Sequence, residues 1–92
     1  LHNLIMKKSN ISIITPCFNA QNYLDKMINS VISQTYKNWE LIIVDDSSND
    51  NSVMIIKRFI SLDSRIKLLR LNSTSGPAIA RNKAINFAEG RY

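Results

Sequence analysis

The stretch LIIVDDSSND, residues 41–50, places four apolar residues directly before two adjacent carboxylates and a run of small polar residues. Together with the two residues before it, the apolar run predicts a strand, WELIIV (39–44), that is covered on both faces, as in a parallel sheet. Asp45 and Asp46 then stand at the exit of that strand. Because successive strand residues point to opposite faces, we expect the two carboxylates to diverge, which reduces their repulsion.

Strand and helix patterns alternate on either side of this stretch. Strands are predicted at ISIIT (11–15), which Pro16 closes, at WELIIV (39–44) and at RIKLLRL (65–71). Apolar residues at helical spacing predict three helices, with stripes at Leu24, Met27, Ile28, Val31 and Ile32, at Val53, Ile56, Phe59 and Ile60, and at Ala80, Ala84, Phe87 and Ala88. The order predicts an α/β fold, a Rossmann-like three-layer sandwich in which right-handed crossovers join the strands of a parallel sheet.

Length and charge limit the classes of protein to consider. The 92 residues suffice for one small domain, which we predict at residues 11–92, after a leader at residues 1–10 that is in part of cloning origin. The chain stops after the third predicted helix, so the domain is expected to be truncated. The net charge is +5, but the basic residues are scattered without aromatic residues among them, so we expect no nucleic-acid partner.

The sequence also bears on the compartment. No apolar run approaches the ~18 residues of a membrane span, and the single cysteine, Cys17, cannot form an internal disulfide. We therefore expect a cytoplasmic location, at the inner face of the membrane in the full-length protein.

The candidate site lies where the predicted strands end, because ligands of open parallel sheets bind at the carboxyl ends of the strands. By position alone, the acidic pair is explained by a turn that accepts loop N–H groups. Two glycines in the whole chain exclude a Gly-rich phosphate loop. A receiver-like phosphoacceptor site is disfavoured, because the strand at 65–71 ends without a further Asp. The other alternative is a carboxylate that accepts the ring N–H of a nucleotide base.

Two segments, SIITPCFNAQNYLDKMINSVISQTYKNWELIIVDDSSNDNS and SGPAIARNKAINFAEGRY, carry a family resemblance. In order and separation they resemble the amino-terminal, nucleotide-binding part of glycosyltransferase family 2, whose members have the GT-A fold. The resemblance covers Ser12 to Tyr92. It implies the nucleotide-sugar-binding part of a hexosyltransferase that uses a UDP-type donor. It further implies a saccharide or lipid-linked acceptor and a role in bacterial surface polysaccharide synthesis.

The resemblance also implies a set of nucleotide-binding residues. An aromatic ring at the exit of the first strand suits stacking on a base, and an arginine suits an anionic ligand. The same residues can instead pack in the core or form a surface salt bridge, and both alternatives stay open here. The implied set consists of Pro16 and Phe18 in the base pocket, Asn19 bracing the loop, Asp46 on the base, Asp45 beside it as support, and Arg81 near the nucleotide or diphosphate.

The resemblance places a divalent metal, Mn or Mg, on the donor diphosphate of the full-length enzyme. Its ligands and the catalytic base are expected beyond Tyr92, so the chain is predicted to hold no metal ligand and no catalytic residue and to be inactive alone. The other acidic residues are predicted to be isolated from one another: Asp25, Glu40, Asp50, Asp63 and Glu89.

Two further expectations concern partners. A non-catalytic nucleotide-binding or interaction module is the alternative to an enzyme. In the family a fourth strand pairs beside the first, so without it the first strand has an open edge. We expect such an edge to lead to self-association of the isolated chain.

Overall fold

The computed structural model describes residues 11–71 together with Asn82 and Ile85. Three parallel strands form a sheet in the order β1-β2-β3, with bounds Ile11–Cys17, Trp39–Asp46 and Ile66–Leu71. The connections are α2, Leu24–Ile32, and α3, Ser52–Leu62. The predicted α/β alternation and parallel sheet are confirmed.

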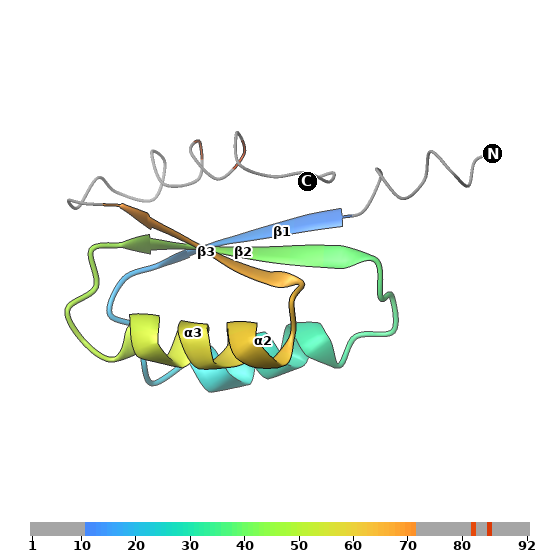
Figure 1. Ribbon diagram of the computed structural model, residues 1–92, viewed down its shortest axis with the longest axis horizontal. Coiled ribbons are helices and arrows are strands. Elements are labelled where there is room, and N and C mark those ends of the chain that lie inside the picture. The colour runs from blue at the N-terminus through green and yellow to red at the C-terminus, as the bar shows by residue number, and fades with distance from the viewer. Residues whose placement is uncertain (1–10, 72–81, 83–84, 86–92) are drawn as a thin grey trace.

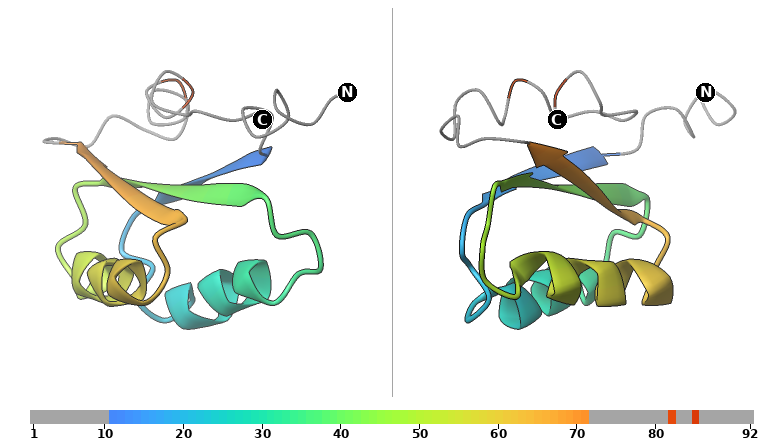
Figure 2. Two further views of the ribbon diagram at one scale, coloured as in Figure 1. Left: turned by 45° about the vertical axis from the view of Figure 1, so that its right-hand side comes forward. Right: turned by 60° about the vertical axis from the view of Figure 1, so that its left-hand side comes forward.

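Both connecting helices lie side by side on one face of the sheet (Figure 1, Figure 2). The predicted sandwich requires a third helix on the other face. Asn82 and Ile85 are helical, and the remainder of that predicted helix lies outside the described residues. The described part of the chain is therefore a sheet with one helical layer.

Strand β2 is the centre of the sheet, and all eight of its residues are buried. It is two residues longer than predicted, because the acidic pair belongs to the strand. Asp45 is in register with Cys17 of β1 and with Arg70 of β3, and Asp46 is in register with Leu71. The backbone pairing with β1 and β3 therefore extends β2 through Asp45 and Asp46, which the apolar pattern does not include.

Strand β1 also runs further than predicted, through Pro16 to Cys17. The N–H of Ile11 donates to the carbonyl of Asn38 at 3.1 Å. Since N–H directions alternate along a strand, the nitrogen of Pro16 faces away from β2. A proline at that position of an edge strand removes no ladder hydrogen bond, which explains why Pro16 does not end the strand.

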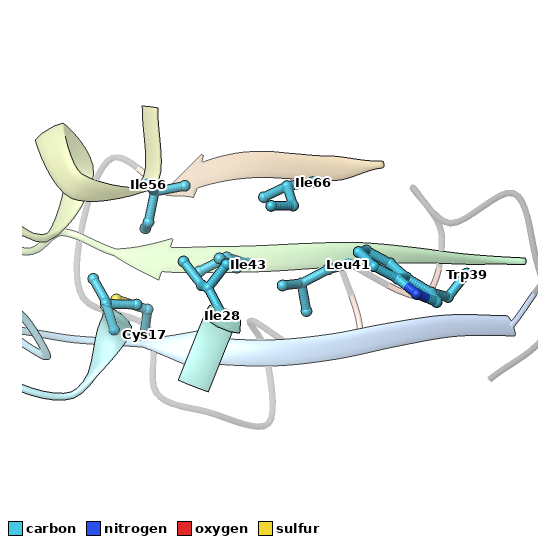
Figure 3. Close-up of a cluster of buried hydrophobic side chains, with 8 residues drawn as sticks. Cys17, Ile28, Trp39, Leu41, Ile43, Ile56 and Ile66 are labelled. Carbon is cyan, nitrogen blue, oxygen red and sulfur yellow. The ribbon is translucent and has the colours of Figure 1, made fainter. Parts of the chain in front are cut away.

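The core lies between the sheet and the two helices. Alternate strand residues, among them Cys17, Leu41, Ile43 and Ile66, point to the helical face, where they meet buried side chains such as Ile28 of α2 (Figure 3). The intervening residues point to the opposite face, where Ile42 and Val44 are fully buried and Ile14, Leu69 and Leu71 pack against them. The pleat therefore divides β2 between two apolar clusters.

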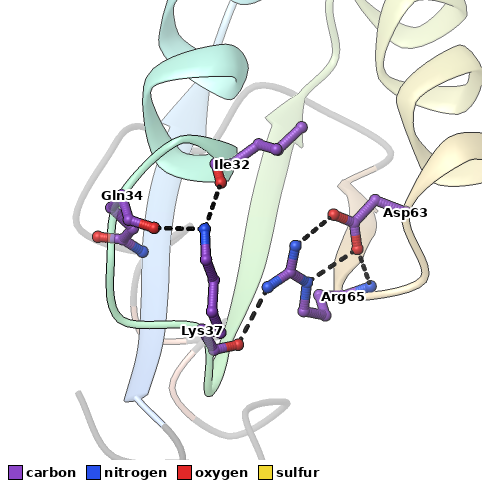
Figure 4. Close-up of polar contacts among 5 residues, drawn as sticks. All are labelled: Ile32, Gln34, Lys37, Asp63 and Arg65. Atoms are coloured by element: carbon purple, nitrogen blue, oxygen red, sulfur yellow. Dashed lines mark hydrogen bonds and ion pairs between the residues drawn. The ribbon is translucent and has the colours of Figure 1, made fainter.

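At the amino ends of the strands, a polar cluster joins the ends of both helices (Figure 4). Arg65 donates to the carboxylate of Asp63 at 2.7 and 3.0 Å and to the carbonyl of Lys37 at 3.0 Å, and its guanidinium lies 3.8 Å from the ring centre of Trp39. The Lys37 ammonium donates to the carbonyl of Gln34 at 2.7 Å, at the end of α2. We call Lys37, Trp39, Asp63 and Arg65 the amino-end cluster.

Neither helix in the described part of the chain has the length and apolar composition that a membrane crossing requires.

Candidate functional site

The pleat separates the two carboxylates at the end of β2. Asp45 shares the helical face with Cys17 and Arg70, which are in register with it. Asp46 shares the opposite face with Leu71, which is in register with it, and with Pro16, which is in register with Val44. Asp45 is fully buried, and Asp46 is 5% exposed. The two side chains therefore have different surroundings and cannot act as a chelating pair.

The loop after β1 is held by side chains of the loop after β2. Three consecutive backbone N–H groups donate across the gap: Asn19 to Ser48 Oγ at 2.8 Å, Ala20 to Ser52 Oγ at 2.9 Å and Gln21 to Asp50 Oδ2 at 3.2 Å. Consecutive N–H groups of a loop can cradle a phosphate. Side-chain oxygens of the chain itself accept the hydrogen bonds of these three N–H groups, so the three are not available to a phosphate in this arrangement.

The same two loops also bond in the reverse direction. The side-chain oxygens of Asn19 and Gln21 accept the N–H groups of Asn49 and Asn51, at 2.9 and 2.8 Å. Asn19 has a positive φ of 49°, which asparagine tolerates better than most residues. We call the five hydrogen bonds between residues 19–21 and 48–52 the loop clamp.

Asp50 joins the loop clamp to helix α3. Its Oδ1 accepts the N–H of Ser52 at 2.9 Å, which satisfies a donor at the first turn, while Oδ2 accepts the N–H of Gln21. Desolvation alone would raise the pKa of Asp50, but hydrogen bonds from the hydroxyl and N–H of Ser52 and from the N–H of Gln21 outweigh it and lower the pKa. Asp50 is therefore held as a carboxylate.

Asp45 supports the loop after β2 from the end of the strand. Its Oδ2 accepts the N–H of Ser48 at 3.1 Å and lies 3.9 Å from Nε of Arg70, too far for a hydrogen bond. Its Oδ1 is buried without a hydrogen-bond partner in the described structure. Beside this pair is a hollow of about 390 Å³ that is lined by Ser47, Ser48, Arg70 and Leu71.

Cys17 lies beneath the loop clamp and is buried. Desolvation raises the pKa of its thiol, the charge of Asp45 adds to the increase, and hydrogen bonds with Ser52 and Ser48 oppose it. A buried thiol with a raised pKa is a poor nucleophile. Cys17 is therefore a packing residue.

The structure places five of the six predicted nucleotide-binding residues at the carboxyl edge of the sheet. Pro16 and Asp46 share one face, Asn19 belongs to the loop clamp, and Asp45 lies on the helical face. The ring of Phe18 is 53% exposed, so it is not a core residue. A second hollow, of about 190 Å³, lies along β1 and α2 and is lined by Thr15, Pro16, Cys17, Ala20, Tyr23, Leu24 and Met27.

Arg81 lies outside the described residues, and its predicted role stays a prediction.

Three of the acidic residues that were expected to be isolated from one another have separate partners of other kinds. Asp50 bonds two loops, Asp63 pairs with Arg65, and Glu40 accepts hydrogen bonds from Ser12 and from Lys67, the latter at 2.9 Å. Within residues 11–71, with Asn82 and Ile85, no three His, Cys, Asp or Glu side chains are grouped so that they could hold a metal ion. The described residues do not fit a divalent metal.

The clamp residues Gln21, Ser48, Asp50 and Ser52 were not among the predicted site residues. Ser48, Asp50 and Ser52 alternate in the sequence, but alternation predicts a shared direction only within a strand, and here β2 ends at Asp46 and α3 begins at Ser52. Their partners lie about 30 positions away, so only the parallel pairing of β1 and β2 brings them together.

Comparison with known proteins gives a family match. The model of the family "Glycosyl transferase family 2" matches residues 12–92. The putative teichuronic acid biosynthesis glycosyltransferase TuaG of Bacillus subtilis is 44% identical over 82 residues, which are 89% of this chain and 32% of TuaG. The Escherichia coli protein WfgD, a UDP-Glc:alpha-D-GlcNAc-diphosphoundecaprenol beta-1,3-glucosyltransferase, is 46% identical over 89% of this chain and 32% of its own length. The chain thus spans about a third of these relatives.

Solved structures agree on the fold. The crystal structure of S. aureus TarS in complex with UDP superimposes with a TM-score of 0.81 at 31% identity, over 88% of this chain and 25% of the TarS chain. A mannosyltransferase from Pyrobaculum calidifontis, solved with GDP-Man and Mn²⁺, gives a TM-score of 0.80 at 22% identity, over 86% of this chain and 24% of its own. The second likeness concerns the fold alone.

Proposed function

The chain belongs to glycosyltransferase family 2, and on this basis we propose that it forms the nucleotide-binding part of an enzyme that transfers a sugar from a UDP-sugar donor. The observation that carries the proposal is the division at the end of β2, where Asp45 turns to the loop and Asp46 to the face that holds Pro16. The UDP complex of TarS, similar over 88% of this chain, supports a uridine nucleotide.

In this proposal each predicted residue has one task. Asp46 accepts the ring N–H of the base in a charge-assisted hydrogen bond. Phe18 and Pro16 provide apolar contacts to the base, Asn19 braces their loop, and Asp45 supports the loop from the helical face. Arg81 approaches the nucleotide or its diphosphate, where an always-charged guanidinium is suited to anionic oxygens.

The acceptor and the location belong to the same proposal. WfgD acts on a diphosphoundecaprenol-linked sugar, and TuaG is assigned to teichuronic acid synthesis. We place the present protein in bacterial surface polysaccharide synthesis with a saccharide or lipid-linked acceptor, in the cytoplasm at the inner face of the membrane. A Mn or Mg ion on the donor diphosphate would be held by residues beyond Tyr92, as would the catalytic base, so the chain alone is inactive.

Calorimetry with UDP tests the proposal on Asp46. In the full-length protein, Asp46→Ala should weaken UDP binding roughly 10- to 100-fold, the effect of losing one hydrogen bond to a charged group. Asp25→Ala is the matched control, because it removes an exposed carboxylate from α2 and should leave the affinity unchanged. Equal affinities of the Asp46→Ala variant and the parent would contradict the assignment.

A non-catalytic module makes a different prediction: it binds UDP but releases no UDP from a UDP-sugar in the presence of metal and acceptor. An Asp-x-Asp sequence shortly after Tyr92 in the gene favours the enzyme. The receiver-like alternative has no support from the family match.

Self-association is the remaining part of the proposal. In the described sheet, β1 has β2 on one side and no strand on the other. An exposed edge of this kind can pair with a second chain. In sedimentation, the isolated 92-residue chain should form dimers or larger species, whereas a form extended by the following strand should be monomeric. A monodisperse monomer of the isolated chain would contradict the proposal.

A further inference from the structure

The predicted base site is assembled from two segments that are distant in the sequence. Pro16, Phe18 and Asn19 lie at the end of β1 and in its loop, and Asp46 ends β2. The aromatic ring and the carboxylate must keep a fixed separation if both are to contact one base. Their relative position therefore depends on whatever joins the two loops.

Backbone pairing of β1 and β2 cannot do this, because it stops before the loops begin. The last pair in register is Cys17 with Asp45. Two residues further along each strand the backbone leaves extended geometry, with positive φ angles of 49° at Asn19 and 66° at Ser47. Beyond this point the backbone N–H and carbonyl groups of the segments after β1 and β2 no longer face one another as in a ladder.

The loop clamp takes over where the ladder ends. It pairs a backbone N–H of one loop with a side-chain oxygen of the other in all five bonds, in both directions across the gap. The ladder relates residues 28 positions apart (Cys17 with Asp45), and the clamp bonds relate residues 29 to 32 apart. The clamp thus continues the pairing of β1 and β2 with side chains as one partner of each bond.

We propose that Ser48 and Gln21 are positioning residues for nucleotide binding, which act by holding the loop of Phe18 and Asn19 at a fixed distance from Asp46. This inference rests on the proposed function. Ser48 is suited to the test because its clamp bond does not involve α3. Gln21 accepts the N–H of Asn51, the N-cap residue of α3, but the first-turn N–H of Ser52 is satisfied by Asp50. Removal of either side chain leaves that bond in place.

The variants are Ser48→Ala and Gln21→Ala in the full-length protein, with UDP affinity measured by calorimetry. Each removes one clamp bond and should weaken UDP binding about 3- to 10-fold. Ser48→Thr keeps the hydroxyl and should restore the affinity. Ser61→Ala is the matched control, because Ser61 bonds the carbonyl of Arg58 at 2.7 Å near the far end of α3.

Hydrogen exchange of the backbone amides of residues 19–21 distinguishes a clamp that acts as a unit from a bond with only a local effect. A local effect of Ser48 would change the exchange rate at Asn19 alone. If the clamp acts as a unit, Ser48→Ala speeds exchange at Asn19 and also at Ala20 and Gln21, which bond other side chains. Faster exchange at Asn19 alone would overturn the inference.

The outcomes separate the two levels of proposal. If the parent does not bind UDP, the proposed function fails and this inference fails with it. If Asp46→Ala binds UDP more weakly than the parent, as proposed, but Ser48→Ala and Gln21→Ala bind it as tightly as Ser61→Ala, this inference alone fails. Weaker binding by both variants, with rescue by Ser48→Thr, supports it.

Discussion

The two ends of the sheet differ in how their charges are compensated. In the amino-end cluster, Arg65 has hydrogen bonds to Asp63 and to the Lys37 carbonyl and lies over Trp39. At the carboxyl end, the fully buried Asp45 has one N–H partner at 3.1 Å, and Arg70 lies 3.9 Å away. Trp39 Nε1 and Asp45 Oδ1 both lack hydrogen-bond partners in the described structure, but the indole is neutral and the carboxylate is charged.

The difference separates stability from binding. Well-paired charges and a covered aromatic ring stabilise the fold, whereas a buried charge with few partners costs free energy. We infer that the amino-end cluster stabilises the fold, whereas the polar groups at the carboxyl end are retained although their burial costs free energy of folding. Substitutions at the two ends should then change different quantities.

The largest effect is expected from Arg65→Ala, which removes three kinds of contact at once. The free energy of unfolding should fall by about 1–3 kcal/mol, from the lost stacking on Trp39 and the lost pair with Asp63. UDP affinity should stay unchanged, because the cluster lies at the opposite end of the strands from the base site.

Arg65→Lys keeps the charge but loses the planar fork, so it should recover less than half of the loss in urea unfolding. Arg58→Ala, on the exposed surface of α3, is the control and should cost less than 0.5 kcal/mol, roughly the limit for surface substitutions. An Arg65→Ala variant with parent stability, or with weaker UDP binding, would break the separation of the two ends.

The sequence predicted much of this arrangement. The apolar spacing from Leu24 to Ile32 gave the bounds of α2, and the run before Asp45 identified the buried central strand. These features depend on neighbours in the sequence or on burial alone. The prediction also placed both carboxylates at the strand exit with divergent directions, which follows from the pleat.

The remaining features could not be predicted because they join residues that are distant in the sequence. Arg65 stacks on Trp39, and Ser48 receives the N–H of Asn19, only after two strands have paired in register. Pro16 was taken as a strand end, since proline usually breaks a ladder. Its tolerance here depends on which side of β1 has a neighbour, and composition carries no information about that.

A smaller effect is expected from acid at the amino-end cluster. The side-chain hydrogen bond from Arg65 lowers the pKa of Asp63, and desolvation opposes the change. A lowered pKa in the folded state means that the ionised carboxylate stabilises the fold above the unfolded value of about 3.9. That contribution is lost as the pH falls below about 4, through the pKa of the folded state.

Asp63→Asn isolates this contribution from the titration of other carboxylates, including Asp50. At pH 6 the variant should be less stable than the parent by about 0.5–1 kcal/mol, and at a pH below the folded pKa the two should unfold at the same urea concentration. A difference that persists in acid would show that the charge of Asp63 does not stabilise the amino end.

The smallest effect is expected from the matching substitution at the other end, Asp45→Asn. The asparagine oxygen can still accept the N–H of Ser48. The attraction that is lost acts over 3.9 Å, and the side chain of Arg70 is half exposed to solvent, which weakens it. Removing a buried charge also removes its desolvation cost, which is several kcal/mol for a poorly paired ion. The loss of unfolding free energy should therefore be smaller than that of Asp63→Asn, and a larger loss would mean that the carboxyl end is as well compensated as the amino end.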